Sequence, residues 1–406
     1  MTANVITTSC CIAGGGPAGL MLGLLLARAG VDVIVLEKHA DFLRDFRGDT
    51  IHPSTMEVMH ELGYLDEFLT LPHQRVPRLV AQFGAQALAL ADFSHLPVHA
   101  KFIAMMPQWD FLNFLAMKAN GYPKFRLLMQ TEATALIDDQ SRVVGVRADT
   151  PSGPTEIRAD LIVAADGRDS LLRRNSGLTV KDFGAPMDAL WFRLPRQTDD
   201  TDQTQGRFQS GRIFVMLNRG DYWQCAFVIP KGGNEQLRAL GIEAFRHDVG
   251  ALLPFEAARA QCIADWDHVK LLTVQVNRLV TWWREGLICI GDAAHAMSPV
   301  GGVGVNLAVQ DAVAAANILA APLRDKQLRS AHLAAVQQRR EWPTRVTQRL
   351  QLTMQNNIIA PVLTEKGAVR PPLALRLITC IPGLNRIPAR LIGLGVRPEH
   401  VQTSLA

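Results

Sequence analysis

The 406-residue sequence lacks the features that mark secreted and membrane-spanning proteins. Its six cysteines form neither a C-x-x-C pair nor a regular framework, and several lie in apolar runs where cysteine acts as a small buried hydrophobe. No basic segment precedes the first apolar run, and no later run reaches the roughly 18 uninterrupted apolar residues of a transmembrane helix. We therefore expect a protein of the reducing cytoplasm, without membrane association.

The chain also has few charged residues and no basic cluster. Charged residues make up 20% and hydrophobic residues 48% of the sequence, a balance that excludes a largely disordered protein. The net charge is only +4, and Lys and Arg are dispersed rather than grouped with aromatic residues, which argues against nucleic-acid binding. For this length we expect two or three domains.

Several catalytic motifs are missing as well. Neither the G-x-S-x-G turn of serine hydrolases nor the H-E-x-x-H helix of zinc proteases is present, and we expect no metal site. The sequence also has no internal repeat and no low-complexity segment. The motifs that the sequence does contain are glycine-rich turns.

A βαβ unit occupies residues 7–38 and is the strongest signal in the chain. An apolar run at 10–13 leads into a glycine loop, a helical stretch to residue 29 and a second β-branched run at 31–36. Strand, glycine loop, helix and strand in this order are typical of a unit that binds the phosphates of a dinucleotide.

The loop of this unit has the sequence Gly14-Gly15-Gly16-Pro17-Ala18-Gly19. The first glycine of such a G-x-G-x-x-G loop permits a tight turn, the second lets backbone approach a pyrophosphate, and the third allows close helix packing. The N–H groups at the start of the helix favour phosphate binding. We therefore expect all of these residues except Gly15 to contact a dinucleotide.

Glu37 and Lys38 end the second strand of the unit. Glu37 lies 23 residues after Gly14, close to the roughly 20 at which a carboxylate can accept the ribose hydroxyls of adenosine. We expect both residues at the cofactor. The motif alone does not choose between FAD and NAD.

The rest of the chain alternates between strand-like and helical stretches. We expect a hairpin at 79–83 and 86–91, a helix at 102–119, a buried strand at 160–166, mostly strands from 183 to about 276, a strand at 287–290, and long helices at 305–319 and 328–356.

Three segments together carry a resemblance to a known family. They are Gly14-x-Gly16-x-x-Gly19 with Glu37, Asp166-Gly167 after a strand, and Gly291-Asp292 followed by Pro299-x-Gly301-Gly302-x-Gly304-x-Asn306. The chain resembles the single-component FAD-dependent aromatic hydroxylases, the p-hydroxybenzoate hydroxylase-like flavoprotein monooxygenases. The resemblance covers nearly the whole chain and is weakest over 183–276 and in the C-terminal tail.

This resemblance implies an α/β fold with three parts. A Rossmann-like, discontinuous FAD-binding domain is expected at 1–75, 98–182 and 277–370. A β-sheet substrate domain is expected to be inserted at 76–97 and 183–276. C-terminal helices are expected at 371–406, where the tail packs on the body or forms a homodimer contact.

The resemblance also implies roles for individual residues at the adenosine and phosphate end of FAD. Glu37 binds the adenosine ribose, while Arg47 and Gln108 lie along the pyrophosphate and ribityl chain. Asp292, in the turn that begins at Gly291, holds the ribityl or phosphate region. Asp166 lies in a segment that touches both FAD and the transient nicotinamide cofactor.

A further set of residues is implied beside the isoalloxazine ring. Pro299, Gly301 and Gly302 form the loop at the ring and are the catalytic candidates. The backbone of Gly304, Val305 and Asn306 continues from this loop. A helix N-terminus near Gly304 favours the negative charge that a reduced flavin carries.

The implied reaction is the hydroxylation of an aromatic or phenol-like small molecule. NAD(P)H reduces FAD, O₂ forms a flavin C4a-hydroperoxide, and the distal oxygen attacks an electron-rich ring carbon. Disulfide-reductase-like flavoproteins carry a second G-x-G-x-x-G unit for NAD(P)H, and this sequence does not. We therefore expect NAD(P)H to dock transiently in a groove, as a co-substrate, or the electrons to come from elsewhere.

Five side chains are candidates for substrate chemistry, each with an ordinary alternative. His52 and His295 are the histidines nearest the motifs, and His295 is a weak candidate base that more readily caps the Gly291-Asp292 turn. Arg212, Tyr222 and Trp223 can line the substrate site or simply pack in their strands.

Other functions remain open at this point. A flavin-dependent halogenase would carry W-x-W-x-I-P, whereas residues 225–230 read C-A-F-V-I-P. An FAD-dependent dehydrogenase or reductase of a polyprenyl- or quinone-type substrate shares the glycine-rich loop but does not use O₂. A non-catalytic FAD-binding scaffold is the alternative from a different class.

Overall fold

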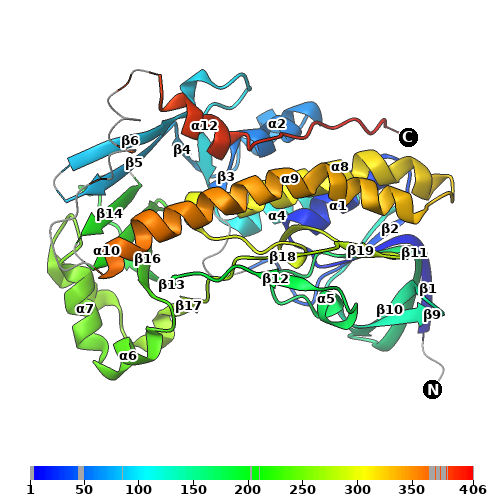
Figure 1. Ribbon diagram of the computed structural model, residues 1–406, viewed down its shortest axis with the longest axis horizontal. Coiled ribbons are helices and arrows are strands. Elements are labelled where there is room, and N and C mark those ends of the chain that lie inside the picture. The colour runs from blue at the N-terminus through cyan, green and yellow to red at the C-terminus, as the bar shows by residue number, and fades with distance from the viewer. Residues whose placement is uncertain are drawn as a thin grey trace.

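The structure is a computed structural model that describes residues 4–43, 50–84, 86–201, 204–209, 211–364, 371, 375, 381 and 383–405. Two sheets stand at opposite ends of the molecule, and long helices run between them (Figure 1). The predicted α/β class and the Rossmann-like unit are both confirmed.

The first sheet contains the βαβ unit. Its path is β19-β20-β11-β1-β2-β8, and β10 and β9 extend it from β11. The strands are β1 (Asn4–Ala13), β2 (Val33–Leu36), β8 (Phe125–Leu128), β9 (Glu132–Asp139), β10 (Arg142–Thr150), β11 (Gly153–Ala164), β19 (Trp283–Arg284) and β20 (Leu287–Cys289).

This sheet is parallel at its centre, where its strands are apolar on both faces. β1 pairs with β2 and β11 in parallel, with Cys10 opposite Val33 and Leu161. α1 (Pro17–Arg28) and α4 (Gln108–Asn120) belong to the same apolar core as one face of this sheet. Because parallel strands are buried on both faces, a near-continuous apolar run is their sequence signature.

Two sequence expectations need correction here. The stretch 102–119 is not one helix: β7 (Ile103–Met105) precedes α4, because Pro107 interrupts the helical stretch before Gln108. The strand expected at 160–166 begins earlier, since β11 pairs along β10 as well as β1.

The second sheet has seven strands in the order β17-β13-β16-β15-β14-β5-β6. The expected hairpin is confirmed and joins this sheet through β14. The strands are β5 (Arg78–Phe83), β6 (Gln86–Asp92), β13 (Met187–Pro195), β14 (Gln205–Gln209), β15 (Arg212–Asn218), β16 (Tyr222–Pro230) and β17 (Lys270–Leu272).

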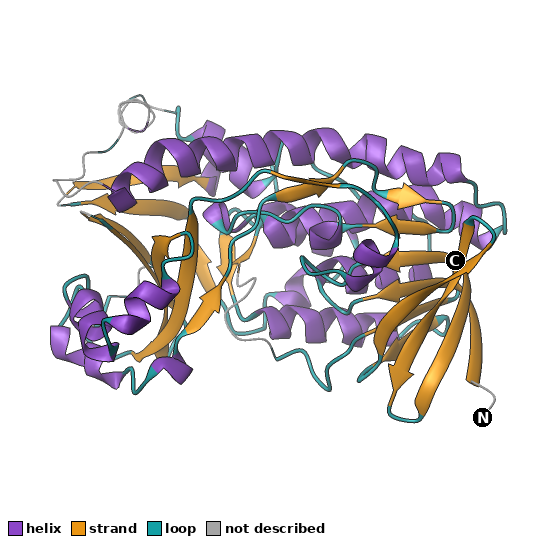
Figure 2. Cartoon of the chain, turned by 60° about the horizontal axis from the view of Figure 1, so that its bottom comes forward, coloured by secondary structure: helices purple, strands orange, loops and turns teal. Residues whose placement is uncertain are grey.

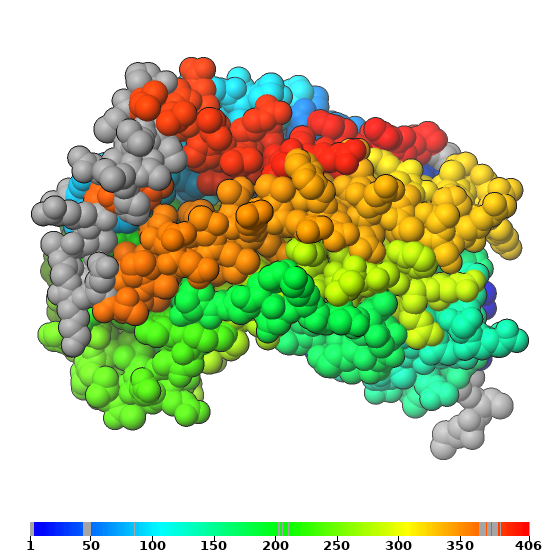
Figure 3. Space-filling view, in the orientation of Figure 1, coloured from blue at the N-terminus to red at the C-terminus, as the bar shows by residue number. Residues whose placement is uncertain are grey.

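One face of the second sheet is covered by α7 (Ile242–Gly250), with α6 (Asn234–Ala239) beside it. These helices and the sheet form one lobe, and Figure 2 shows the first sheet fanning out at the other end of the molecule. In the space-filling view, the lower edge of the molecule is indented between the two lobes (Figure 3).

The remaining elements connect the lobes. Two small sheets are formed by β3 (Thr50–Ile51), β4 (Gln74–Val76) and β7, and by β12 (Val180–Asp182) with β18 (Asn277–Leu279). The other helices are α2 (Pro53–Glu61), α3 (Leu65–Phe68), α5 (Leu171–Asn175), α8 (Gly304–Arg324), α9 (Ser330–Met354), α10 (Ala360–Thr364) and α12 (Arg386–Gly393).

α8 is long and apolar enough to cross a membrane, but most of it is buried inside the fold, as in the core helix of a globular protein. The C-terminal tail is only partly helical among its described residues. After α12, residues 394–405 run in an extended path over α8 and α9 (Figure 1). We keep the three-part domain division given above as a proposal.

Candidate functional site

The glycine loop between β1 and α1 has the geometry that its three motif glycines require. Gly14 has φ +110°, and a Cβ there would lie 2.3 Å from the carbonyl oxygen of Ala165. A Cβ on Gly19 would lie 1.9 Å from the carbonyl oxygen of Gly14. Gly16, by contrast, has no atom within 4 Å of its Cβ position. The loop is thus closed behind Gly14 and Gly19 and open at Gly16, where a phosphate can approach.

Glu37 is held at the end of β2 by the loop itself. Its carboxylate accepts hydrogen bonds from the backbone N–H of Gly15 (3.1 Å) and of His39 (3.0 Å). A carboxylate offers about four lone-pair sites, so these two hydrogen bonds are compatible with acceptance from ribose hydroxyls. Lys38 beside it is exposed and pairs with Glu132 at 3.8 Å.

A cleft of about 780 Å³ opens beside this loop. It brings together predicted residues from four separate segments, namely Gly14, Gly16, Glu37, Lys38, Gln108 and Asp166. Gln108 is the first residue of α4, so the N-terminal end of a second helix also faces the cleft. The opposite wall comes from the second sheet and includes Trp191 and Lys270.

Asp166 reaches the cleft, but its carboxylate mainly caps α5. It accepts from the N–H groups of Leu171 (2.9 Å) and Leu172 (3.3 Å) and from the hydroxyl of Ser170 (2.5 Å). Burial raises the pKa of Asp166 despite these hydrogen bonds, which lower it. The residue therefore fixes the turn at Gly167, which lines the same cleft.

The turn at Gly291 and Asp292 lies against the start of α1. Gly291 has φ +58°, and a Cβ there would lie 3.2 Å from the Cβ of Ala18. The Asp292 carboxylate is partly exposed and lies 3.5 Å from the guanidinium of Arg168, a cleft residue. The turn is thus next to the phosphate loop, although its residues are not among those that line the cleft.

The loop from Pro299 to Gly302 is held from two sides. The Gln351 amide donates to the carbonyl oxygens of Ser298 and Val300, at 2.9 Å each. On the other side, the Thr50 hydroxyl donates to the carbonyl oxygen of Gly302 at 2.9 Å. Gly301 and Gly302 both have positive φ, and a Cβ on Gly302 would lie 2.6 Å from Thr50 Oγ1.

α8 begins directly after this loop. A Cβ on Gly304 would meet no atom within 4 Å, so the helix N-terminus is open to a ligand there, while Val305 is largely buried. The Asn306 side chain is also buried and accepts from the hydroxyls of Ser54 and Thr55, which ties α8 to α2.

The two candidate histidines are both fully enclosed. His295 Nε2 donates to the Asp311 carboxylate at 2.6 Å, and the ring packs on Trp282 with the ring centroids 5.0 Å apart. His52 Nδ1 lies 2.8 Å from the carbonyl oxygen of Ile392 in α12. Burial lowers the pKa of His52 to about 4, so it is neutral at pH 7. These contacts indicate that both rings stabilise the fold.

The three substrate candidates on the second sheet are divided between its faces. Trp223 is fully buried against α7, its indole N–H donates to Asp200 at 2.8 Å, and Arg212 pairs with Asp248 of α7. Arg212 and Trp223 therefore lie on the α7 side of the sheet, away from the face that carries Trp191 into the cleft. Tyr222 points to the other face, where the Arg193 guanidinium stacks on its ring at 4.7 Å.

The face of the second sheet opposite α7 meets the loop at Pro299. Val300 of this loop and Val228 of β16 both pack against an apolar cluster that contains Met187 and Ile213. Trp191 projects from the same face into the cleft. Side chains alternate along strands, so in the three central strands this face consists of Met187, Ala189, Trp191, Arg193, Ile213, Val215, Leu217, Tyr222, Gln224, Ala226 and Val228. At the edge, β17 adds Lys270 opposite Trp191.

Arg47, predicted at the pyrophosphate, lies outside the described residues. Sequence reasoning missed Trp191, Lys270 and Arg168 in the cleft. Alternation along β13 could have indicated Trp191, but only with the strand register known. Among the described residues, no group of His, Cys, Asp or Glu side chains could hold a metal ion.

Comparisons with known proteins agree with this geometry. Residues 7–350 match a family described as an FAD binding domain. A curated relative, 6-methylpretetramide 4-monooxygenase from Streptomyces rimosus, is 30% identical over 402 residues, which cover 98% of this chain and 95% of the relative. Para-nitrophenol 4-monooxygenase from a Pseudomonas strain is 24% identical over 345 residues, 77% of this chain and 78% of the relative.

Solved structures show the same fold. The OxyS anhydrotetracycline hydroxylase from Streptomyces rimosus has a TM-score of 0.74 at 22% identity, covering 97% of this chain and 77% of that one. A p-nitrophenol 4-monooxygenase from Pseudomonas putida has the same TM-score at 19% identity, covering 97% of this chain and all of that one. The chain belongs to the FAD binding domain family and is an FAD-dependent monooxygenase, an oxidoreductase of the aromatic hydroxylase group.

Proposed function

We propose that this monooxygenase hydroxylates a neutral, polycyclic phenol-like substrate and takes its electrons from NAD(P)H. One observation carries the proposal: Val300, in the loop predicted at the flavin ring, packs against the same apolar cluster as Val228, and this cluster contains Met187 and Ile213 of the second sheet. The ring loop and an apolar sheet face therefore lie together, and a flat aromatic molecule fits between such surfaces.

The side chains of this sheet face support a neutral substrate. In the three central strands Arg193, which stacks on Tyr222, is the charged residue of this face, and Lys270 of β17 lies opposite Trp191 at its edge. The side-chain Oε1 of Gln224 accepts from Arg219 Nε at 3.0 Å. Met187, Ile213 and Val228 belong to the apolar region that Val300 packs against, so a substrate carboxylate in that part of the face would lack a charged partner. A relative with 30% identity is named 6-methylpretetramide 4-monooxygenase.

The described residues fit FAD. When bound, FAD supplies the electron transfer and the oxygen chemistry. Gly16 and the N-terminus of α1 would hold the phosphates, and Glu37 would accept from the ribose. The N-terminus of α8 at Gly304 would stabilise negative charge on the ring. The apolar sheet face excludes water from the site.

The cleft offers a place for the nicotinamide nucleotide. Lys38, Arg168, Arg174 and Lys270 line it, and such cations favour phosphate groups. NAD(P)H would thus dock between the two lobes. Cytoplasmic location and homodimer formation stay predictions.

The test is flavin reduction without oxygen, followed by turnover in isotopically labelled O₂. Purified holoenzyme is mixed with NADH or NADPH, alone and with 6-methylpretetramide, p-nitrophenol and other mono- and polycyclic phenols. We expect a polycyclic phenol to accelerate reduction and its product to contain one labelled oxygen atom.

Two outcomes contradict the proposal. Product formed without labelled oxygen would indicate a dehydrogenase or reductase of a polyprenyl- or quinone-type substrate. If neither nucleotide reduces the flavin with any compound, the NAD(P)H-dependent reaction is wrong, and a scaffold becomes the better account.

A further inference from the structure

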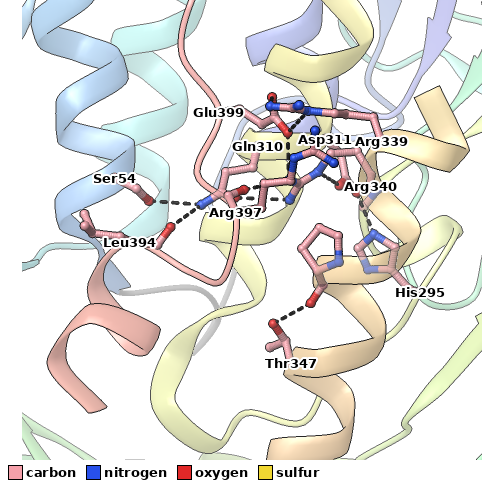
Figure 4. A network of polar contacts seen from close by, with 12 residues as sticks. Ser54, His295, Gln310, Asp311, Arg339, Arg340, Thr347, Leu394, Arg397 and Glu399 are labelled. Carbon is pink, nitrogen blue, oxygen red and sulfur yellow. Dashed lines mark hydrogen bonds and ion pairs between the residues drawn. The ribbon is translucent and has the colours of Figure 1, made fainter. Parts of the chain in front are cut away.

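Behind the Gly291 turn lies a buried polar network that no part of the proposed reaction uses (Figure 4). It starts at Asp311 of α8. One carboxylate oxygen accepts from the backbone N–H of Gly291 (3.1 Å) and meets His295 Nε2 (2.6 Å), and the other accepts from Arg340 Nε (2.9 Å). Asp311 and Arg340 have no exposed surface.

Arg340 carries the network from α9 to the C-terminal segment 394–405. Its Nη1 donates to Glu399 Oε1 and to the carbonyl oxygen of Arg397, at 3.1 Å each. Arg339 also donates to both carboxylate oxygens of Glu399, at 2.8 and 3.0 Å. Glu399 is 4% exposed, although it lies in an extended segment.

A second branch leads from Arg340 to the start of α8. Arg340 Nη2 donates to the side-chain Oε1 of Gln310 at 3.1 Å. The side-chain Nε2 of Gln310 in turn donates to the Ser54 hydroxyl (3.2 Å) and to the backbone carbonyl oxygen of Leu394 (3.0 Å). Ser54 contacts Asn306. The C-terminal segment is therefore tied to both ends of the predicted flavin site.

The charges of the network depend on this segment. Asp311 and Glu399 balance Arg340 and Arg339, so these four side chains together carry no net charge. Burial raises the pKa of Asp311, but His295 and Arg340 lower it by more, and the carboxylate stays ionised. Without Glu399, a buried guanidinium would lose one of its two anionic partners, and such a loss shifts the groups that remain.

We infer that Glu399 is a positioning residue for FAD: through Arg340 and Asp311 it holds the Gly291-Asp292 turn in the form that binds the cofactor. The side chain touches neither the cleft nor the loop at the flavin ring. It acts on the turn indirectly, in the way that the hydrogen-bond partners of metal ligands orient those ligands. The inference concerns FAD binding and does not depend on the substrate proposed above.

The test compares three variants of the full chain. Glu399→Gln keeps the shape of the side chain and removes its charge. Glu61→Gln is the matched control, because Glu61 of α2 fastens the same segment through His400 and the backbone N–H of Val401 (2.7 Å) without contacting the network. Arg339→Gln is a milder change at the partly exposed side of Glu399.

The readouts are the FAD dissociation constant of the apoprotein, the visible circular dichroism of bound flavin, and the melting temperature of the apoprotein. We expect Glu399→Gln to weaken FAD binding about tenfold and to alter the flavin spectrum. Arg339→Gln should have a smaller effect in the same direction. Glu61→Gln should leave FAD affinity within about twofold, even if it lowers the melting temperature.

Two results overturn the inference. In the first, Glu399→Gln and Glu61→Gln lower the melting temperature alike and leave FAD affinity and the flavin spectrum unchanged, which would make the segment a structural strap only. In the second, Glu399→Gln does not fold and Arg339→Gln, which then carries the test, binds FAD as the parent does.

Discussion

Gly16 differs from the other glycines of the first turn in a way that separates ligand binding from folding. Gly14 and Gly19 have no room for a Cβ because backbone oxygens lie within 2.3 and 1.9 Å of its position. Gly16 has free space there and a φ of −79°, which any L-residue adopts. The protein itself therefore needs no glycine at this position.

We expect Gly16→Ala to fold and to lose FAD. The apoprotein should change in unfolding free energy by less than about 0.5 kcal/mol. FAD affinity should fall at least about tenfold, or 1.4 kcal/mol, because the methyl group occupies the space of a phosphate. Denaturant unfolding of the apoprotein and FAD titration measure the two effects, and unchanged FAD affinity would place the pyrophosphate elsewhere.

At the scale of elements, the second sheet serves two different cores with its two faces. Trp191 and Phe192 are neighbours on β13, yet Trp191 reaches the cleft and Phe192 packs on Phe245 of α7, with ring centroids 5.4 Å apart. The pair is a natural comparison, because truncating each aromatic ring changes only one face.

Trp191→Ala should affect ligands, and Phe192→Ala should affect stability. We expect Trp191→Ala to raise the Michaelis constant for the aromatic substrate or for NAD(P)H about tenfold, through lost contact area. Phe192→Ala should cost about 3–5 kcal/mol of unfolding free energy and leave these constants unchanged well below its melting temperature. Steady-state kinetics and denaturant unfolding of both variants test this prediction. The reverse pattern would show that Phe192, and not Trp191, is on the face that contacts the ligands.

The elements also show what could be predicted from the sequence. The βαβ unit could be predicted, because its glycine spacing and its order of strand and helix are local features of the sequence. The inward face of β16 could not: Trp223 and Gln224 are both buried, so alternation between buried and exposed residues does not reveal which one faces the site. Likewise, Glu399 joins Arg340 across 59 positions, and nothing in the spacing indicates that pair.

For the molecule as a whole, α9 runs from the lobe of the first sheet to the lobe of the second (Figure 1). Arg340 in its middle contacts Asp311, and Gln351 near its end holds the loop at Pro299. A π-helical turn then continues α9 into α10, which packs on the second sheet. We therefore expect the two lobes to unfold together in one transition.

His52 should make this global stability depend on pH. Its pKa is lowered by burial to about 4, below the unfolded value of about 6.5. Only the unfolded chain then gains this proton between pH 6.5 and pH 4, so stability is complete above pH 6.5 and falls by about 3 kcal/mol as the pH approaches 4.

The check is denaturant unfolding from pH 7 to pH 4 for the parent and for His52→Asn, whose amide can still donate to Ile392. We expect the parent to lose more stability than the variant over this range. Equal slopes would show that His52 takes up a proton in the folded protein.

The apolar character of α8 has a practical consequence for handling the protein. Its sequence would pass for a membrane span, and it stays out of water only while the surrounding helices cover it. Any local opening that separates α9 from α8 exposes an apolar surface through which molecules can aggregate. Heat-treated samples should therefore be lost by aggregation before they can refold, and shelf life will follow the rate of that opening.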